Sequence, residues 1–308
     1  MKFEVLSNPE FLAEGTAMQD LENPDRILIG SRETESGLTA RQELEDIYAH
    51  WIPKDKIVTS NVWSSELSKL VANAFLAQRI SSINAISALC EKTGANIGEV
   101  ARAVGMDSRI GPKFLAASVG FGGSCFKKDI LHLTYLCQQY GLHEVAAYWE
   151  SVVRINDYQR ERFVSTMLQA MFNTLNGKKI CLLGFAFKAN TGDTRESPAT
   201  YIAKRLLEEK AELIISDPHA LPNARKDMEG MEGTISYQQD PYEAARGCHA
   251  IAVLTEWPIY KELDFQNIFE QMVKPAYIFD GRNIIDHQKC FDIGFNIYPI
   301  GKAALTHF

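Results

Sequence analysis

Lys179-Ile180-Cys181-Leu182-Leu183-Gly184 is an apolar run that ends on glycine, the pattern of a strand buried on both faces of a sheet. Three similar runs follow it, at residues 212–217, 250–255 and 277–280, with helical segments between them. One of these helices is expected over Pro198–Glu208, because Ser197 can cap it and proline suits its first position. Alternating strands and helices predict a parallel sheet, so residues 177–308 are expected to form a Rossmann-like domain.

The residues ahead of this domain divide into a helical block and a short mixed segment. Residues 61–176 show helical periodicity and are predicted to form an all-helical dimerisation domain, with helices at 64–94, 97–104, 128–140 and 144–172. Residues 1–60 predict one helix at 39–51 and short strands at 3–9, 26–30 and 57–58. The fold class is therefore α/β.

Composition excludes several classes of protein. The chain has 308 residues and a net charge of -7, which argues against a nucleic-acid binder. Its six cysteines form no Cys-x-x-Cys pair, so neither a metal site nor a disulfide framework is predicted. The sequence shows no signal peptide and no apolar run of the roughly 18 residues that a membrane span needs. A cytoplasmic protein without membrane contact is expected.

The stretch Gly120-Phe121-Gly122-Gly123-Ser124-Cys125-Phe126-Lys127-Lys128-Asp129 combines a glycine-rich loop with a cysteine at the start of a helical pattern. Glycines let backbone approach a ligand closely. Positive potential at a helix N-terminus, beside two lysines, favours a reactive thiolate. We expect Cys125 to be a nucleophile next to a bound ligand, and the alternative is a buried structural cysteine.

Other charged residues lie where a ligand could meet them. Lys188 and Arg282 follow strands of the predicted sheet, whose carboxyl ends bind ligands, and both could contact phosphate. Lys69 and Asn73 share one helix face, and Glu10 follows a proline turn. Each of these could instead be an ordinary solvated residue. No Gly-x-Gly-x-x-Gly fingerprint occurs in the sequence.

Four ordered motifs, at residues 8–15, 69–73, 120–129 and 192–198, together resemble the UDP-glucose 6-dehydrogenases of the UDP-glucose/GDP-mannose dehydrogenase family. The resemblance implies an NAD-dependent, four-electron oxidation of UDP-glucose to UDP-glucuronate through a cysteine thiohemiacetal and thioester. It makes Cys125 the nucleophile, Lys69 and Glu10 the groups for proton transfer and thioester hydrolysis, and Asn73 and Asp129 the groups that position the oxyanion and the water.

The resemblance also implies binding residues. Those expected at the substrate are Phe11, Leu12, Ala13, Glu14, Lys69, Asn73, Arg109, Phe114, Ala116, Phe121, Gly122, Phe187, Lys188 and Arg282. Arg109 would reach the sugar nucleotide of a neighbouring subunit. Those expected at NAD are Glu14, Cys125, Lys128 and Arg195. The chain departs from the family pattern at Ala116, where lysine is common, and at Lys127, which replaces glutamine.

Family members carry a whole NAD-binding domain ahead of the first motif. Residues 1–60 are accordingly expected to be a remnant of that domain, and the chain to be a fragment that is inactive alone. Its expected partners are UDP-glucose and further copies of itself, as a dimer at least or as a hexamer. The alternatives are a non-catalytic module that binds UDP-sugars and dimerises, or a dehydrogenase of GDP-mannose or UDP-N-acetylmannosamine.

Overall fold

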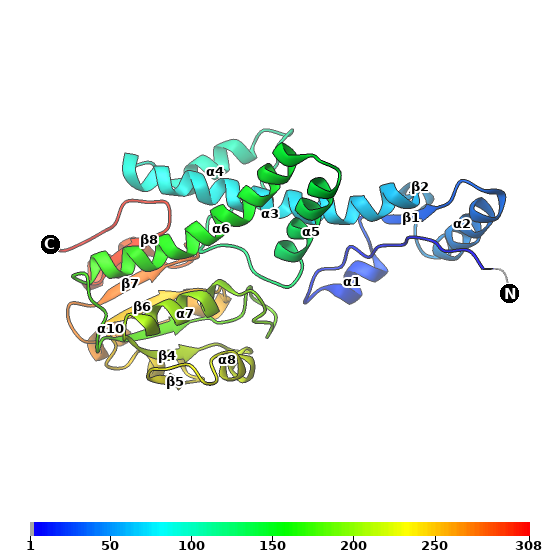
Figure 1. The fold of residues 1–308 in the computed structure, drawn as a ribbon. Helices are drawn as coiled ribbons and strands as arrows, with labels where there is room; N and C mark the ends of the chain where they lie inside the picture. Colours follow the sequence, from blue (N-terminus) through cyan, green and yellow to red (C-terminus); the bar gives the residue numbers. More distant parts are fainter. Residues whose placement is uncertain (1–2) are drawn as a thin grey trace.

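The computed structural model describes residues 3–308, and one long helix, α3 (Val62–Thr93), connects its parts. Figure 1 shows a small unit at the N-terminal end of α3, a group of helices along its length, and a sheet domain beside its C-terminal half. The Asn61 side chain accepts a hydrogen bond from Ser64 N at 2.8 Å and caps α3, while Gly94 ends it with φ +77°.

The N-terminal unit holds a two-stranded parallel sheet. Its elements are α1 (Ala17–Glu22), β1 (Ile27–Ser31), α2 (Glu35–Tyr48), the 3-10 helix η1 (Lys54–Lys56) and β2 (Ile57–Asn61). β1 pairs with β2 in register from Ile27↔Ile57 to Ser31↔Asn61. The predicted helix at 39–51 begins earlier, because the Thr34 side chain caps it by accepting from Gly37 N.

The strand predicted at residues 3–9 is wrong. Only Ser7 pairs with a strand there, through two backbone hydrogen bonds to Gly30 in an isolated antiparallel bridge. The carbonyl of Leu28, two residues before Gly30 in β1, accepts from the Asn8 side chain at 2.8 Å instead of from a backbone N–H. Pro9 has no N–H to extend the ladder, so the pairing stops after one residue.

The helical part confirms the four predicted helices, within a few residues at each end. Besides α3 it consists of α4 (Ile97–Gly105), α5 (Phe126–Gln139) and α6 (His143–Ala170). α3, α5 and α6 pack on a core that includes Ala74, Ala77, Ile130, Leu133 and Val152. The alanines of α3 let the neighbouring helices approach closely, and this packing fixes the start of α5, where Cys125 lies.

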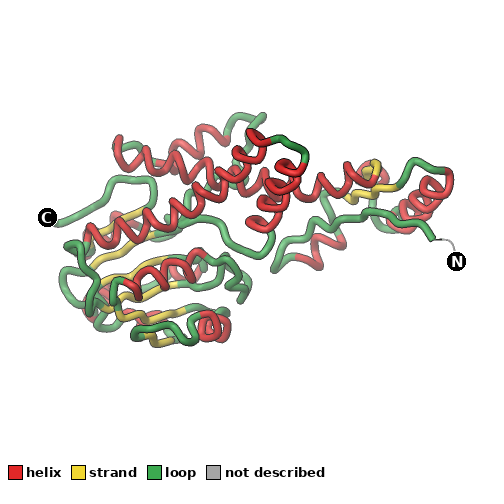
Figure 2. The backbone as a smooth tube through the Cα atoms, in the orientation of Figure 1, coloured by secondary structure: helices red, strands yellow, loops and turns green. Residues whose placement is uncertain are grey.

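The C-terminal part is a six-stranded, wholly parallel sheet in the order β5-β4-β3-β6-β7-β8, which confirms the predicted parallel sheet. Its strands are β3 (Lys179–Leu183), β4 (Glu212–Ser216), β5 (Ile235–Tyr237), β6 (Ala250–Val253), β7 (Tyr277–Asp280) and β8 (Asn296–Pro299). Figure 2 shows the strands as one layer with helices around it. The order reverses between β3 and β6, the place where such sheets bind ligands.

Helices cover the sheet. They are α7 (Pro198–Glu208), α8 (Leu221–Asp227), α9 (Pro241–Ala245), the 3-10 helix η2 (Pro258–Lys261), α10 (Phe265–Gln271) and α11 (His287–Ile293). As expected, Ser197 caps α7 by accepting from Ala199 N. No helix within residues 3–308 is both long and apolar enough to cross a membrane.

Candidate functional site

Cys125 is exposed at the N-terminal end of α5, whereas the other five cysteines are buried. Burial raises the pKa of the Cys248 and Cys290 thiols to about 12, and it also raises the pKa of the Cys181 thiol well above its usual value. Those thiols are held in the protonated, unreactive form. Cys125 is therefore the cysteine that solvent and ligands can reach, and the alternative of a buried structural cysteine is wrong.

The loop that carries Cys125 is held by polar side chains from α6. Asn156 makes two hydrogen bonds to Phe121, accepting from its N–H at 2.8 Å and donating to its carbonyl at 3.1 Å. Gln159 donates to the carbonyl of Ser118 at 2.6 Å. These hydrogen bonds pair buried backbone N–H and C=O groups that have no partner in a sheet or helix. They therefore fix the loop ahead of the cysteine.

The glycines of this loop are required by packing against the C-terminal domain. A Cβ on Gly122 would lie 2.7 Å from the Glu196 carbonyl oxygen and 2.8 Å from Cβ of Phe187. Gly123, with φ +84°, faces the Phe187 ring. The loop thus touches Phe187, which the sequence placed at the substrate. The Phe121 side chain is buried against Phe126, with ring centroids 5.7 Å apart, and its backbone N–H and carbonyl are both hydrogen-bonded to Asn156.

Lys69 and Asn73 of α3 reach two other segments of the predicted site. Asn73 Nδ2 donates to Asp129 Oδ2 at 2.6 Å, and Asp129 N in turn donates to the carbonyl of Cys125 at 2.9 Å. Lys69 Nζ donates to the carbonyl of Glu10 at 2.6 Å and lies 3.6 Å from its Oε1. One face of α3 therefore connects the cysteine helix with the segment that follows Pro9.

The segment after Glu10 also reaches the C-terminal domain. Lys188 Nζ donates to the carbonyl of Glu14 at 2.7 Å, and Thr191 Oγ1 donates to Glu14 Oε1 at 2.7 Å. Phe11 lies under the Arg26 guanidinium, with Cζ 3.7 Å from the ring centroid. Ala13 N donates to Asp20 Oδ2 at 2.8 Å. Leu12 is partly exposed beside them.

Arg282 lies at the point where the strand order reverses. Its Nε donates to the carbonyl of Leu254 after β6 at 2.8 Å, and its Nη2 donates to the carbonyl of Phe187 after β3 at 2.9 Å. Its Nη1 pairs with Glu256 Oε2 at 3.2 Å. The Arg282 side chain therefore braces the two strand ends around the predicted ligand position.

Some predicted residues lie outside this group. The Arg109 guanidinium pairs with Asp107 at 2.6 Å, and its side chain is 87% exposed on the loop after α4. Phe114, with φ +62°, and Ala116 are exposed on the segment between α4 and the cysteine loop. Among residues 3–308, no hydrogen bond or ion pair links these three residues to Cys125.

Comparison with known proteins identifies the chain's relatives. It is 57% identical to UDP-glucose 6-dehydrogenase 5 of Oryza sativa subsp. japonica and 54% identical to UDP-glucose 6-dehydrogenase 1 of Arabidopsis thaliana. Each match covers 98% of this chain and 67% of the relative. The chain belongs to the UDP-glucose/GDP-mannose dehydrogenase family.

The family's three domain descriptions match successive parts of the chain. The NAD binding domain matches residues 1–52, the central domain residues 63–158 and the UDP binding domain residues 181–287. A UDP-glucose dehydrogenase from the archaeon Pyrobaculum islandicum superposes with a TM-score of 0.85 at 34% identity. That match covers 98% of this chain and 64% of the archaeal one, so the chain spans about two thirds of the length of its relatives.

NAD, the cofactor of this family of dehydrogenases, fits the charges around Cys125. Lys128, 3.7 Å from Asp129 Oδ1, has a side chain that is 72% exposed. Arg195 is 65% exposed and pairs with Asp193 at 2.6 Å, which raises the pKa of its guanidinium. Exposed cations such as these suit the diphosphate of a dinucleotide.

The sequence interpretation missed the residues that hold the cysteine loop from α6. Asn156, Gln159 and Arg160 are buried polar residues in a helix that is otherwise packed through apolar ones. Their spacing of three and four places them on one helix face, and this was the signal that could have found them.

Proposed function

We propose that this chain carries the catalytic cysteine and the UDP-sugar site of an NAD-dependent UDP-glucose 6-dehydrogenase. The observation that carries the proposal is the link from α3 to α5. The Asn73–Asp129 hydrogen bond places the polar face of α3 one helical turn from the exposed Cys125 thiol. The nucleophile and the Asp129 carboxylate then lie one helical turn apart on α5, and Lys69 lies one turn from Asn73 on α3, which supplies the kinds of group that acyl chemistry on a cysteine uses.

Proton transfer falls to Lys69 and Glu10. Lys69 Nζ donates to the carbonyl of Glu10 and lies 3.6 Å from its carboxylate, so a small side-chain movement, without rearrangement of the backbone, would bring the two groups within reach for proton transfer. The same pair can take the proton of the C6 hydroxyl as the alcohol becomes an aldehyde. It can also take a proton from the water that attacks the thioester later.

Cys125 forms and releases the covalent intermediates. Its sulfur adds to the aldehyde carbon to give a thiohemiacetal, whose oxidation gives a thioester. Water then breaks the C–S bond, giving the carboxylate of UDP-glucuronate and the free thiol. Asn73 and Asp129 are proposed to hold the oxyanion and the attacking water. The Asn73 amide has a second N–H beside the one given to Asp129.

NAD, when bound, accepts the hydride of each of the two oxidations. Glu14, Lys128 and Arg195 are proposed to hold it beside Cys125. The first family domain matches residues 1–52, and we propose that residues 1–60 are the last strands and helix of the NAD-binding domain. Residues 61–176 would then be the central dimerisation domain, and residues 177–308 the UDP-sugar domain.

The UDP-sugar is proposed to bind where β3 and β6 diverge. Phe187, Lys188 and Arg282 lie there, and the cysteine loop with Gly122 closes one side. Phe11, Leu12, Ala13 and Glu14 close the other side through the Glu14–Lys188 contact. Phe114, Ala116 and the loop at Phe121 are proposed to border the approach to this site, and Arg109 is proposed to serve a neighbouring subunit in a cytoplasmic homo-oligomer.

Protection of Cys125 against alkylation tests the ligand assignment. UDP-glucose should slow the reaction of Cys125 with iodoacetamide in this chain, and GDP-mannose should not. Equal protection by both nucleotide sugars would contradict the assignment to UDP-glucose. Turnover is tested by NADH formation from UDP-glucose and NAD, with Cys125→Ala as the inactive variant.

A binding module without catalysis is the second candidate, and one observation favours it. The sequence contains no Gly-x-Gly-x-x-Gly turn for a dinucleotide. Protection by UDP-glucose without NADH formation would support this candidate for the chain. NADH formation that is lost in Cys125→Ala would exclude it.

A further inference from the structure

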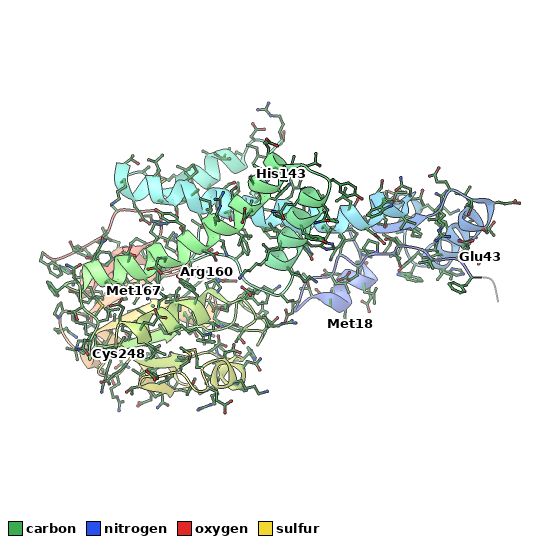
Figure 3. The ribbon with its side chains drawn as sticks, viewed as in Figure 1. Met18, Glu43, His143, Arg160, Met167 and Cys248 are labelled. Atoms are coloured by element: carbon green, nitrogen blue, oxygen red, sulfur yellow. The ribbon has the colours of Figure 1, made fainter. Side chains whose placement is uncertain are left out.

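Arg160 is a buried cation of α6 that the proposed chemistry does not use. Its residue is 4% exposed, and Figure 3 labels it on the side of α6 toward the sheet domain. Its Nη2 donates to the carbonyl of Phe121 at 2.8 Å and to the carbonyl of Glu196 at 3.3 Å. Asp157, 3.5 Å from Nη1, is a distant ion-pair partner and is half-exposed.

The two carbonyls belong to different parts of the chain. Phe121 lies in the loop that ends at Cys125, and Glu196 lies in the turn between β3 and α7 that carries Arg195. Two further contacts join the same loop and turn. Gly123 N donates to the carbonyl of Arg195 at 2.9 Å, and Lys127 Nζ pairs with Glu196 Oε2 at 2.9 Å. Glu196 adopts φ +52°, a conformation that surrounding contacts must maintain.

Burial of the Arg160 guanidinium costs free energy, because the charge loses its contact with water. Burial lowers the pKa of Arg160, and its Nε has no hydrogen-bond partner among residues 3–308. An apolar side chain of similar volume would fill this position without that cost. An apolar side chain could not donate hydrogen bonds to the two carbonyls. This donation explains why a charged residue occupies the buried position.

We propose that Arg160 is a positioning residue that couples the Cys125 loop to the turn at residues 193–197. The coupling keeps the thiol and Arg195 in a fixed relation, although one belongs to the helical part and the other to the sheet domain. The inference rests on the proposed function only in giving Cys125 and Arg195 their roles, since the contacts themselves do not depend on it.

Hydrogen exchange of the full chain tests the coupling without turnover. In Arg160→Ala, the amides at 121–125 and those at 194–197 should both exchange about fivefold faster or more. Arg154→Ala is the matched control, because Arg154 is an exposed arginine two turns earlier on the same helix. Faster exchange in only one of the two segments, or an equal effect of Arg154→Ala, would overturn the proposal.

Chemical rescue separates a donor from a packing role. Guanidinium ion, well below denaturing concentrations, should restore slow exchange in both segments of Arg160→Ala, and tetramethylammonium at equal ionic strength should not. Equal effects of the two ions would show that packing alone holds the loop. The fold is verified by thiol titration, because a folded chain exposes only Cys125 of its six cysteines.

If Arg160→Ala exposes the buried thiols, that variant is not folded, and Arg160→Met is used in its place. It keeps the stem and removes every donor, so both segments should again exchange faster together, and wild-type exchange in both would overturn the proposal. Where turnover is measurable, kcat should fall about tenfold while UDP-glucose protects Cys125 as well as before, because misplacing a reacting group slows chemistry more than binding. Absence of turnover in every variant would count against the proposed function and leave the exchange result standing.

Discussion

Asn73 and Asp129, which are 56 positions apart in the sequence, share a 2.6 Å hydrogen bond between α3 and α5. The Asp129 side chain is 8% exposed, and its other oxygen lies 3.7 Å from Lys128 Nζ. A buried carboxyl group costs free energy unless it has hydrogen-bond partners of this kind. The bond therefore fixes the helix that begins at Cys125 to the helix that carries Lys69.

Removing the amide should destabilise this junction. Asn73→Ala leaves Asp129 buried with one weak partner, so the free energy of unfolding should fall by about 1–3 kcal/mol. Urea unfolding followed by circular dichroism measures the change. Gln78→Ala is the control, because Gln78 bonds only to exposed Ser82 on the same helix. An equal loss of stability in both variants would show that the buried Asn73–Asp129 bond contributes no more than the exposed Gln78–Ser82 bond.

Removing the thiol should change reactivity and leave the fold intact. Cys125→Ala deletes an exposed side chain, so its effect on stability should stay within about 0.5 kcal/mol. Thiol titration of the native chain should find one fast-reacting group, and none in Cys125→Ala. Cys137→Ala, at a buried position of the same helix, should retain the fast group. A fast thiol that survives Cys125→Ala would contradict the assignment of the exposed cysteine.

The sheet could be predicted where the pattern is local. The strands β3, β4, β6 and β7 read as apolar runs because helices cover both faces of the sheet. β5 and β8 escaped prediction because they are edge strands of three and four residues that include Ser236 and Asn296. Their place is set by pairing with β4 and β7, which no local pattern records.

The candidate site likewise has features that a local sequence pattern predicts and features that depend on distant segments. Cys125 was predicted from local sequence, namely the glycines before it, the helix that starts there and the two lysines after it. The pairing of Lys69 with Asn73 was predicted from their spacing on one helix face, where an ordinary solvated face was the alternative. The hydrogen bonds of Arg160 require three segments to meet: α6, the cysteine loop and the turn at residues 193–197. No local sequence pattern indicates which carbonyls a buried arginine will contact. The glycines of the loop were explained by ligand approach alone, whereas Gly122 is also needed for its contact with Phe187 and Glu196.

Adding a methyl group at Gly122 should separate the cysteine loop from the sheet domain. In Gly122→Ala the new Cβ would lie 2.7 Å from the Glu196 carbonyl oxygen, a backbone atom that cannot turn away. The free energy of unfolding should fall by about 1–3 kcal/mol, as overpacking of a tight contact does. Gly98→Ala is the control, because there the new Cβ meets only the Asn96 side chain at 3.2 Å. Denaturant unfolding of the two variants provides the comparison, and equal stabilities would contradict the packing argument.

The contact between α6 and α7 should make stability depend on pH. Glu161 accepts from Tyr201 Oη at 2.8 Å and from Arg205 Nε at 3.0 Å, and the hydrogen bond from Arg205 holds the pKa of this carboxyl below its usual range. A depressed carboxyl pKa adds stability that is present above the unfolded pKa and is lost as pH falls through the folded one.

Glu161→Gln should therefore lower the free energy of unfolding near neutral pH by about 0.5 kcal/mol, a small value because the pair is partly exposed to solvent. The difference from wild type should shrink as the pH falls below the ordinary carboxyl range and should vanish below the depressed pKa of Glu161, where the native carboxyl also becomes neutral. Urea unfolding from neutral to acidic pH measures both the difference near neutral pH and its loss in acid. Glu150→Gln, at an exposed position of α6, should show no such dependence. A constant difference between Glu161→Gln and wild type at all pH values would mean that shape, rather than charge, accounts for the contact.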